Sequence, residues 1–427
     1  MSIRLTKKLL PAAIMLAVSS TSVQAANWLM LQGTEKQNQA PRAKVWGFIQ
    51  AEYQQTDDTK LPSGKPAAFN QNAPDLTSAS GFNIRRARIG VRGNNLPIDS
   101  KVNYFLLTEF GNNGITTGKG GSKGQLTDAS ITLNHIPGAR VRVGLFKTPG
   151  SEEGLQAIGV HNYVNFTNAT NRLLLERFFD KSTGNTERDG PVGAFRDIGV
   201  QVFDSFNLAG WDTSYAIMYG NGHGITADDN KHKDLYLYAS TEKVLGKAGP
   251  RRHGLKFYAW NQSGKRTLAD VGDKDRTRSG LGTTFWNGKY RFAAEYIQAD
   301  GMIFAGTKGA NTPDNGGTFN VQPDQKADGY YFDFGYRVIP NLELNARYDF
   351  LNSGTEKDSN SGTNKDAKRE FTTTTLGAQY FINKKTTLMA NYEIRDIKAP
   401  DAPSAAPVHD IVEAIDNRIS LQLRVVF

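Results

Sequence analysis

The segment RISLQLRVVF (residues 418–427) alternates between apolar and polar side chains. Its apolar residues are Ile419, Leu421, Leu423, Val425 and Phe427, and the residues between them include Arg418, Ser420, Gln422 and Arg424. Successive side chains of a β-strand point to opposite faces, so a strand with this sequence has one apolar and one polar face. The segment therefore predicts a strand that separates an apolar from an aqueous environment.

The same alternation recurs along the chain in segments of about ten residues. It is complete in LELNARYDF (342–350), and TLMANYEIR (387–395) has Met389 as an exception on its polar face. Such segments are typical of a transmembrane β-barrel, whose strands turn apolar residues to lipid and polar residues to the lumen. We predict an all-β fold, a closed antiparallel transmembrane barrel of about 16 strands. The predicted strands lie near residues 43–54, 82–93, 100–111, 125–135, 139–148, 196–205, 211–220, 233–244, 254–263, 279–287, 289–299, 328–339, 342–352, 370–382, 386–397 and 415–427.

Short turns and long polar loops alternate between these strands. The short connections, which are good turn sequences, lie at residues 94–97, 136–138, 287–288, 339–341 and 383–385. The long loops lie near residues 55–81, 112–124, 151–195, 265–277, 303–326, 354–368 and 399–413. In a barrel of this class we expect the short turns on the periplasmic side and the long loops on the outer side.

The first 25 residues have the features of a secretory signal peptide. A basic start with Arg4, Lys7 and Lys8 precedes an apolar run at residues 9–18, and a small-residue cleavage site ends at Ala25. The apolar run is too short to span a bilayer as a helix. We expect cleavage after Ala25, or one residue later, in preference to an ordinary N-terminal helix. Loss of three basic residues lowers the formal net charge from +9 to +6, because 48 basic and 42 acidic residues remain.

The composition agrees with an exported β-rich protein. The 427 residues include 43 Gly, 16 Tyr and 23 Phe and no Cys, and the mean hydropathy of −0.49 argues against a helical membrane protein. After the signal, no apolar run reaches the length of a membrane-spanning helix. We therefore expect three segments: residues 1–25 as the signal peptide, residues 26–42 as a periplasmic lead-in or small helix, and residues 43–427 as an outer-membrane β-barrel.

One predicted strand, FNIRRARIGVRG (82–93), contains four arginines. Arg86, Arg88 and Arg92 share one face, opposite three apolar residues. A charge that faces lipid at mid-bilayer costs roughly 2–4 kcal/mol, so this face is expected to point into the lumen. The remaining arginine, Arg85, is out of phase and is expected near the membrane edge.

Arg140 and Arg142 lie on one face of the next arginine-bearing strand, so the candidate pore-lining residues are Arg86, Arg88, Arg92, Arg140 and Arg142. A column of guanidinium groups can attract anions, because low-dielectric walls focus the field and the planar fork donates to phosphate-like oxygens. The polar faces also carry acids, namely Glu109, Asp128, Glu295, Asp333, Glu343, Asp349 and Glu393. The alternative is therefore that the arginines pair with acids and stiffen the wall.

The third long loop, about residues 150–195, contains an apolar and charged stretch at residues 171–180. Three leucines and two phenylalanines in this stretch indicate that the loop packs against another surface. We expect it to fold into the lumen and narrow the pore, which places Arg172, Arg177 or Arg188 at the constriction. The alternative is a surface hairpin at a contact between subunits.

The chain resembles the phosphate-selective porin O and P family. The segments that carry the resemblance are FNIRRARIGVRG (82–93), TDAS (127–130), VRVGLFKTPGS (141–151), LER (175–177) and FRDIGV (195–200). The terminal Phe427 resembles the sorting signal that the barrel-assembly machinery recognises. The resemblance implies a sixteen-stranded trimeric barrel with an inward third loop, which passes anions such as phosphate or pyrophosphate by passive diffusion through arginines and lysines.

The sequence thus predicts a passive diffusion channel, a porin of the bacterial outer membrane, with a preference for small anionic solutes of the phosphate or polyphosphate kind. A general non-selective porin is the alternative, and an outer-membrane barrel enzyme or adhesin is more distant. None of the six histidines falls in a catalytic motif. His223 and His232 flank two aspartates, which we interpret as a solvated loop in preference to a metal site. We expect no catalytic residue, cofactor, metal or nucleic-acid partner. The expected partners are outer-membrane lipid and further copies of the chain.

Overall fold

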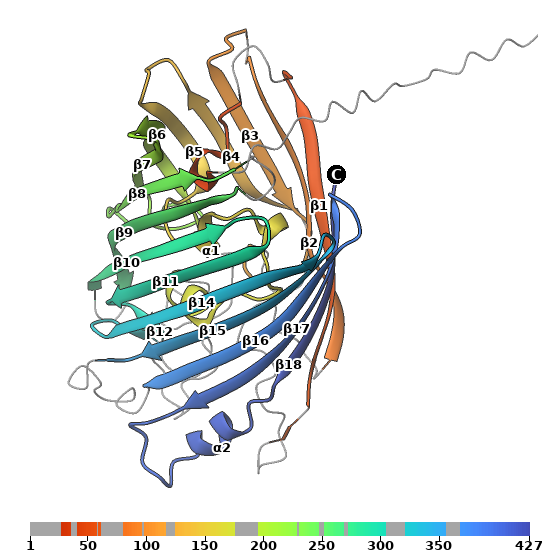
Figure 1. Cartoon of the computed structure of the whole chain (residues 1–427). Helices are drawn as coiled ribbons and strands as arrows, with labels where there is room; N and C mark the ends of the chain where they lie inside the picture. Colours follow the sequence, from red (N-terminus) through yellow and green to blue (C-terminus); the bar gives the residue numbers. More distant parts are fainter. Residues whose placement is uncertain are drawn as a thin grey trace, which may run out of the picture.

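A closed ring of antiparallel strands forms the body of the protein (Figure 1). The computed structural model describes residues 27–35, 41–57, 59–60, 80–95, 98–116, 124–175, 195–228, 230–246, 252–268, 272–304, 321–355 and 368–427. Within these residues sixteen strands close the ring, each strand paired with its sequence neighbours, and β1 pairs with β18 to complete it. The predicted all-β barrel and its strand count are confirmed.

The strands of the ring match the predicted segments to within a few residues at most ends. They are β1 (Lys44–Thr56), β2 (Ser80–Asn94), β3 (Val102–Glu109), β4 (Gln125–Leu133), β5 (Arg140–Lys147), β6 (Arg196–Leu208), β7 (Trp211–Gly220), β8 (Asp234–Val244), β9 (Gly254–Leu268), β10 (Gly272–Trp286), β11 (Tyr290–Asp300), β14 (Lys326–Ile339), β15 (Leu342–Ser353), β16 (Arg369–Phe381), β17 (Thr386–Lys398) and β18 (Arg418–Val426). Two short strands, β12 (Ile303–Phe304) and β13 (Val321–Gln322), pair outside the ring.

The largest difference from the predicted strands is in β9 and β10. The predicted long loop at residues 265–277 is largely strand, because β9 continues to Leu268 and β10 begins at Gly272. Cross-strand pairs hold the extension together, including Lys265 with Asp275 at 2.6 Å. This extension is polar on both faces, so it lacks the alternation on which the strand prediction depends.

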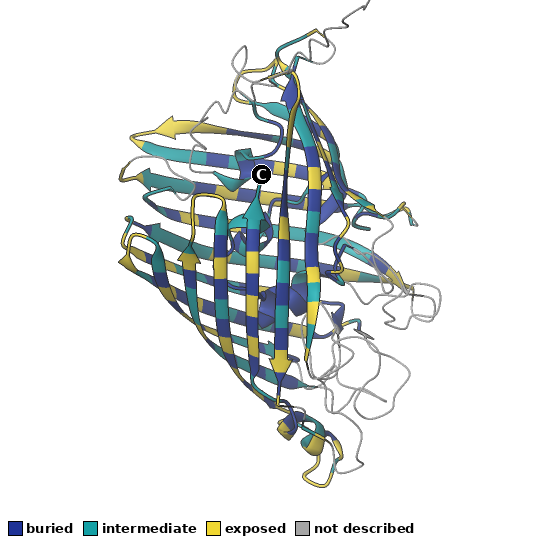
Figure 2. Cartoon of the chain, turned by 90° about the vertical axis from the view of Figure 1, so that its right-hand side faces the viewer, coloured by how far each residue is buried: buried dark blue, intermediate teal, exposed yellow. Residues whose placement is uncertain are grey.

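Exposure alternates along the strands, as Figure 2 shows by its bands. In β18 the apolar Ile419, Leu421 and Leu423 are exposed, whereas Ser420 and Gln422 are buried. The outer face of the ring is therefore apolar and the inner face polar, which is the reverse of a water-soluble protein. A surface of this kind is stable against lipid, with the polar groups facing a lumen.

Helical elements are short. They are η1 (Trp28–Met30), α1 (Glu152–Leu155), η2 (Ile158–Val160), η3 (Thr170–Leu174), which is a π-helical turn, and α2 (Val408–Glu413). Three of them, α1, η2 and η3, lie in the connection between β5 and β6. Among the described residues, no helix is long and apolar enough to cross a lipid bilayer.

Candidate functional site: the polar face of the barrel

Arg85 does not lie at the membrane edge, and that expectation is wrong. The pairing of β1 with β2 shifts register at Gln50 and Ala51, so that Arg85 is the extra residue of a β-bulge. A bulge interrupts the alternation of side chains, and Arg85 and Arg86 both turn to the buried polar side. Arg85 pairs with the carboxylate of Glu52 at 3.2 Å, and both side chains are inaccessible to solvent.

The five predicted arginines all lie on the polar face, and three of them pair with acids. The Arg88 guanidinium contacts the Glu109 carboxylate at 2.6 Å. Arg92 pairs with Glu35, and Arg140 pairs with Asp204. For these three arginines the structure shows the paired wall arrangement that the sequence left open.

Arg86 and Arg142 have neutral partners among the described residues. Arg86 donates to the Gln50 side-chain oxygen at 2.9 Å. Arg142 donates to the backbone oxygen of Gln32 and to the Thr132 hydroxyl, and its guanidinium carbon lies 4.3 Å from the Phe203 ring centroid. Neither guanidinium has a hydrogen-bonded carboxylate among the described residues, although the charges of Glu52 and Glu109 act on Arg86 and that of Asp128 acts on Arg142.

Lys147 adds a third cation with neutral partners, at the end of β5. Its Nζ donates to three backbone oxygens of the loop that follows, those of Gly154 at 2.7 Å, Leu155 at 3.3 Å and Gln156 at 2.7 Å. Lys147 was not among the residues predicted from the sequence, although it lies in VRVGLFKTPGS, a segment that carries the family resemblance. Its signal was weak because a strand-end lysine is common on any surface.

The loop between β5 and β6 hydrogen-bonds with the polar face on widely separated parts of the ring. The contacts join Glu152 to Lys256 on β9 (2.5 Å), Tyr163 to Asp333 on β14 (2.7 Å), Asn168 to Asp349 on β15 (2.7 Å), Asn165 to Glu393 on β17 (2.9 Å) and Arg85 on β2 to Asn165 (2.8 Å). Figure 1 shows α1 and its surroundings in view between the strands. The prediction for the whole loop stays a prediction, because residues 176–194 lie outside the described residues.

Burial changes the ionisation of two side chains in this loop. His161 is buried beside Lys147, Arg86 and Arg424, so desolvation and these positive charges hold its pKa well below the ordinary value for histidine. Burial and the neighbouring Asp333 carboxylate raise the pKa of the Tyr163 hydroxyl well above its usual range. Both groups are therefore neutral near pH 7.

Of the three predicted constriction arginines, Arg172 can be placed. It lies in η3, and its guanidinium carbon is 3.9 Å from the ring centroid of Phe371 on β16. The next residue, Leu173, accepts a hydrogen bond from Arg278 on β10 at 2.8 Å through its backbone oxygen. Arg177 and Arg188 lie outside the described residues.

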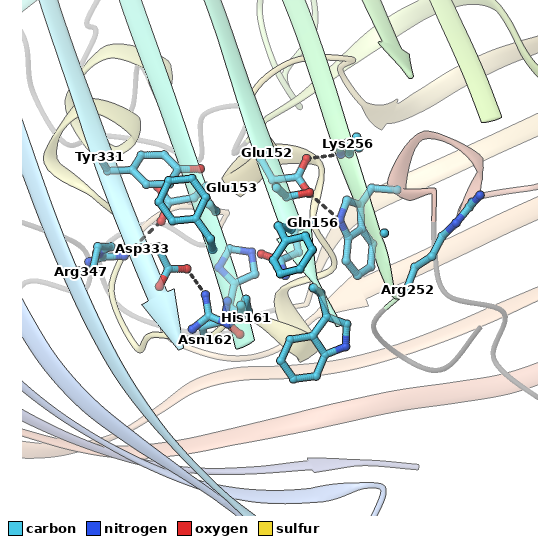
Figure 3. Close-up of a pocket in the computed structure, with 18 of the residues that line it drawn as sticks. Glu152, Glu153, Gln156, His161, Asn162, Arg252, Lys256, Tyr331, Asp333 and Arg347 are labelled. Atoms are coloured by element: carbon cyan, nitrogen blue, oxygen red, sulfur yellow. Dashed lines mark hydrogen bonds and ion pairs between the residues drawn. The ribbon is translucent and has the colours of Figure 1, made fainter. Parts of the chain in front are cut away.

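A cavity lies beside the loop, against strands β8 to β15 (Figure 3). Four bases and four acids line it, and each base pairs with one of the acids. The pairs are Lys256 with Glu152 (2.5 Å), Arg347 with Glu153 (3.2 Å), Arg252 with Glu242 (3.4 Å) and Arg291 with Asp333. Aromatic side chains, including Trp28, Tyr163, Trp286 and Tyr331, complete the lining. The cavity wall is thus polar, aromatic and balanced in charge.

None of the five predicted arginines is among the described residues that line this cavity. The polar face therefore has two different parts. The part on β2 to β5 carries Arg86, Arg142 and Lys147 in addition to the paired arginines, whereas on β8 to β15 each base that lines the cavity is paired with an acid. Strand phase alone identified Arg86 and Arg142 in the first part, whereas the second part depends on which acids the closed ring brings next to which bases.

Phe427 lies at the seam that closes the ring. Its backbone exchanges two hydrogen bonds with Gly47 on β1, at 3.2 and 2.9 Å. Its ring is so close that a Cβ at position 47 would lie 2.4 Å from the ring carbon Cζ. The terminal residue is thus part of the β1–β18 junction.

A closed antiparallel ring with an apolar outer face and a polar inner face defines the class of transmembrane β-barrel proteins. Residues 67–164 and 259–426 match the model of a family described as Phosphate-selective porin O and P, which covers more than half of the chain. The chain belongs to this family, as its sequence motifs predicted. It is a porin, a channel of the bacterial outer membrane.

Solved porin structures share the fold. The chain is similar to the outer membrane channel DcaP of Acinetobacter baumannii, with 16% identity, 93% of this chain and 100% of that chain covered, and a TM-score of 0.56. OmpF of Salmonella typhi, in complex with daunomycin, has 14% identity, coverage of 90% and 97%, and a TM-score of 0.54. The trimer form of OmpT from Vibrio cholerae has 12% identity, coverage of 91% and 99%, and a TM-score of 0.51. A search of curated protein sequences finds no match.

Proposed function

We propose that the channel passes small solutes by passive diffusion and prefers anions of the phosphate or polyphosphate kind. The observation that carries the proposal is the set of three cations, Arg86, Arg142 and Lys147, whose hydrogen-bond partners are neutral oxygens. Their charges add to a positive potential in a low-dielectric enclosure, which raises the local concentration of anions. The family's description supports the same preference.

The preference is a moderate one, because two buried carboxylates are held in the same way. Glu295 accepts hydrogen bonds from Trp260 at 2.9 Å and Tyr331 at 3.1 Å. Asp197 accepts from Tyr236 at 2.9 Å and from a backbone amide. These two carboxylates offset part of the positive charge of Arg86, Arg142 and Lys147.

A general, non-selective porin is the second candidate, and the balanced cavity favours it. Each base that lines the cavity is paired with an acid, so a solute that follows only this route meets little net charge. The two candidates differ in which part of the polar face the ions approach.

The loop between β5 and β6 provides the constriction in this proposal. Its described part hydrogen-bonds with polar side chains on β2, β9, β14, β15 and β17. A segment held by such distant strands divides the enclosed space and narrows it. Arg172, in η3, belongs to this segment, and we assign Arg177 and Arg188 to the same constriction from the sequence.

Export and assembly follow the family pattern in this proposal. Residues 1–25 are removed as a signal peptide, the short turns face the periplasm, and the barrel-assembly machinery recognises the chain through Phe427. The mature chain forms a trimer in the outer membrane, in contact with lipid through its apolar face; the trimer form of OmpT, which shares the fold, supports this state.

The test is the ion selectivity of single channels in planar bilayers under a potassium chloride gradient. The double variant Arg86→Gln/Arg142→Gln removes two charges and retains polar, hydrogen-bonding side chains. A unit charge about 4 Å from an ion is worth about 1 kcal/mol in water, or roughly fivefold in permeability per charge. We expect the reversal potential to move toward zero. The anion-to-cation permeability ratio calculated from it should fall by up to roughly fivefold for each charge removed.

Lys384→Gln is the matched control, because it removes one positive charge from an exposed position in the turn between β16 and β17. This variant should keep the wild-type reversal potential. A wild-type channel without anion preference would favour the general porin, and a double variant with unchanged preference would show that these two arginines do not set it.

A further inference from the structure

Residues 27–35 lie against the polar face of the ring, beside β4 and β5 (Figure 1, dark red). The Gln32 side chain donates to Asp128 on β4 at 2.9 Å, and Asn27 donates to Ser214 on β7 at 2.5 Å. Trp28 donates from its indole nitrogen to Glu152 of α1 at 2.8 Å. The segment therefore bridges the wall and the loop between β5 and β6.

Residues 27–35 also bind two of the predicted pore-lining arginines, Arg92 and Arg142. Glu35 pairs with Arg92, which also donates to the backbone oxygen of Leu31 at 2.9 Å. Arg142 donates to the backbone oxygen of Gln32. The Glu35 carboxylate and the backbone oxygens of Leu31 and Gln32 thus accept hydrogen bonds that Arg92 and Arg142 could otherwise donate to a solute.

Apolar contact is limited to one end of the segment. Leu29 is buried in the same cluster as Phe203 on β6, Ala216 on β7 and Leu155 of α1. Trp28 and Met30 pack against the same cluster. From Leu31 to Glu35 the contacts are hydrogen bonds and one ion pair. Because the contacts of residues 31–35 with the wall are polar, soluble oxyanions can compete for them.

We propose that residues 27–35 form a displaceable plug, in which Glu35 and the backbone oxygens of Leu31 and Gln32 act as internal ligands of an oxyanion site formed by Arg92 and Arg142. Solutes that carry a phosphate or carboxylate group compete with the plug for these guanidinium groups. This inference rests on the proposed function, because it requires that anions approach the β2–β5 part of the wall. The tethered plug has an effective concentration of the order of mM, so solutes in that range displace it.

The first experiment deletes residues 27–35 from the full-length chain and compares single-channel conductance in potassium chloride. We expect a higher conductance and a stronger preference for anions, because the space is open and Glu35 no longer offsets Arg92. Retention of the heat-modifiable band on a denaturing gel shows that the variant is folded. An unchanged conductance in a folded variant would overturn the proposal.

The second experiment locks the plug with a disulfide. A Cβ at Gly33 would lie 3.4 Å from the Cβ of Thr132 on β4, close to the usual separation in a disulfide, and the natural chain has no cysteine. The pair Gly33→Cys/Thr132→Cys is studied oxidised and reduced, with inorganic phosphate and with acetate at equal ionic strength. We expect both anions to produce the higher conductance in the reduced form and neither to do so in the oxidised form.

Glu35→Gln is the companion variant, because Gly33 has a φ of +62°, which a cysteine adopts only with strain. It weakens the contact with Arg92 and keeps the shape of the side chain, so lower concentrations of phosphate should open the channel. Identical responses of the wild type and this variant, or of the oxidised and reduced forms, would contradict a displaceable plug. A wild type without anion preference would instead contradict the proposed function, since the conductance changes do not depend on the sign of selectivity.

Discussion

At the scale of the residue, the polar face is organised by what each arginine contacts. Arg88, Arg92 and Arg140 pair with acids, whereas Arg86 and Arg142 bind neutral oxygens. The same residue type therefore serves two purposes within neighbouring strands. Paired arginines hold acids of neighbouring segments in place, and we propose that those with neutral partners attract anions.

Arg85 provides a test of the paired kind, because it and Glu52 are fully buried. Replacement with alanine leaves a buried carboxylate without its partner, which costs about 3–5 kcal/mol. We expect Arg85→Ala to lower the free energy of unfolding by that amount, measured by urea titration of the refolded barrel in lipid. Lys398→Ala, which removes half of an exposed pair with Asp396, is the control and should change it by less than about 1 kcal/mol. Equal losses of unfolding free energy in the two variants would show that burial does not increase the contribution of the Arg85–Glu52 pair to stability.

Prediction from the sequence reached the face of each arginine but not its partner. The period of two in a strand placed Arg86, Arg88, Arg92, Arg140 and Arg142 on the polar side. Arg85 escaped this rule because a bulge shifts the phase, and nothing in residues 82–93 alone marks the bulge. Glu35, the partner of Arg92, lies outside the strands, so the spacing of residues within a strand could not predict this pair.

At the scale of the element, the β1–β18 seam closes the ring through Gly47 and Phe427. A Cβ at position 47 would meet the Arg88 backbone oxygen and the Phe427 ring, each at 2.4 Å. We expect Gly47→Ala to destabilise the barrel by about 1–3 kcal/mol through overpacking, seen as a lower temperature of the heat-modifiable transition. Gly159→Ala is the control, because its nearest neighbour is 3.9 Å away. An unchanged transition temperature in Gly47→Ala would show that β1 and β18 can move apart at this position without loss of stability.

The loop between β5 and β6 predicts a dependence of stability on pH through His161. Its folded-state pKa is well below the ordinary value, owing to burial and the charges of Lys147, Arg86 and Arg424. Below about pH 6.5 the unfolded chain binds a proton that the folded chain does not, so stability falls as pH decreases, by up to about 1.4 kcal/mol per pH unit. Above about pH 6.5 His161 is neutral in both the folded and the unfolded chain, so it causes no loss of stability there.

The measurement compares the free energy of unfolding of the wild type and His161→Gln at pH 7.5 and pH 5.5. The variant should lose less stability than the wild type over this interval, because other titrating groups are common to both. Parallel losses in the two proteins would contradict the assignment of a neutral, buried His161.

At the scale of the whole molecule, the sequence predicted the barrel because a membrane imposes a repeated constraint on every strand. Lipid outside and water inside produce the alternation seen in β15, β17 and β18. Where that constraint ends, as in the extension of β9 and β10, the prediction of strands failed. The cavity beside β8 to β15 was not predicted, since Lys256, Glu152 and their neighbours meet only in the closed ring.

The central claim is that Arg86, Arg142 and Lys147, which have neutral hydrogen-bond partners, give the channel a preference for anions. The most direct measurement is the reversal potential of single wild-type channels under a potassium chloride gradient at neutral pH. We predict a reversal potential of the sign that chloride permeation gives, and a shift toward zero in Arg86→Gln/Arg142→Gln. A reversal potential at zero, or of the sign that potassium permeation gives, would contradict the account.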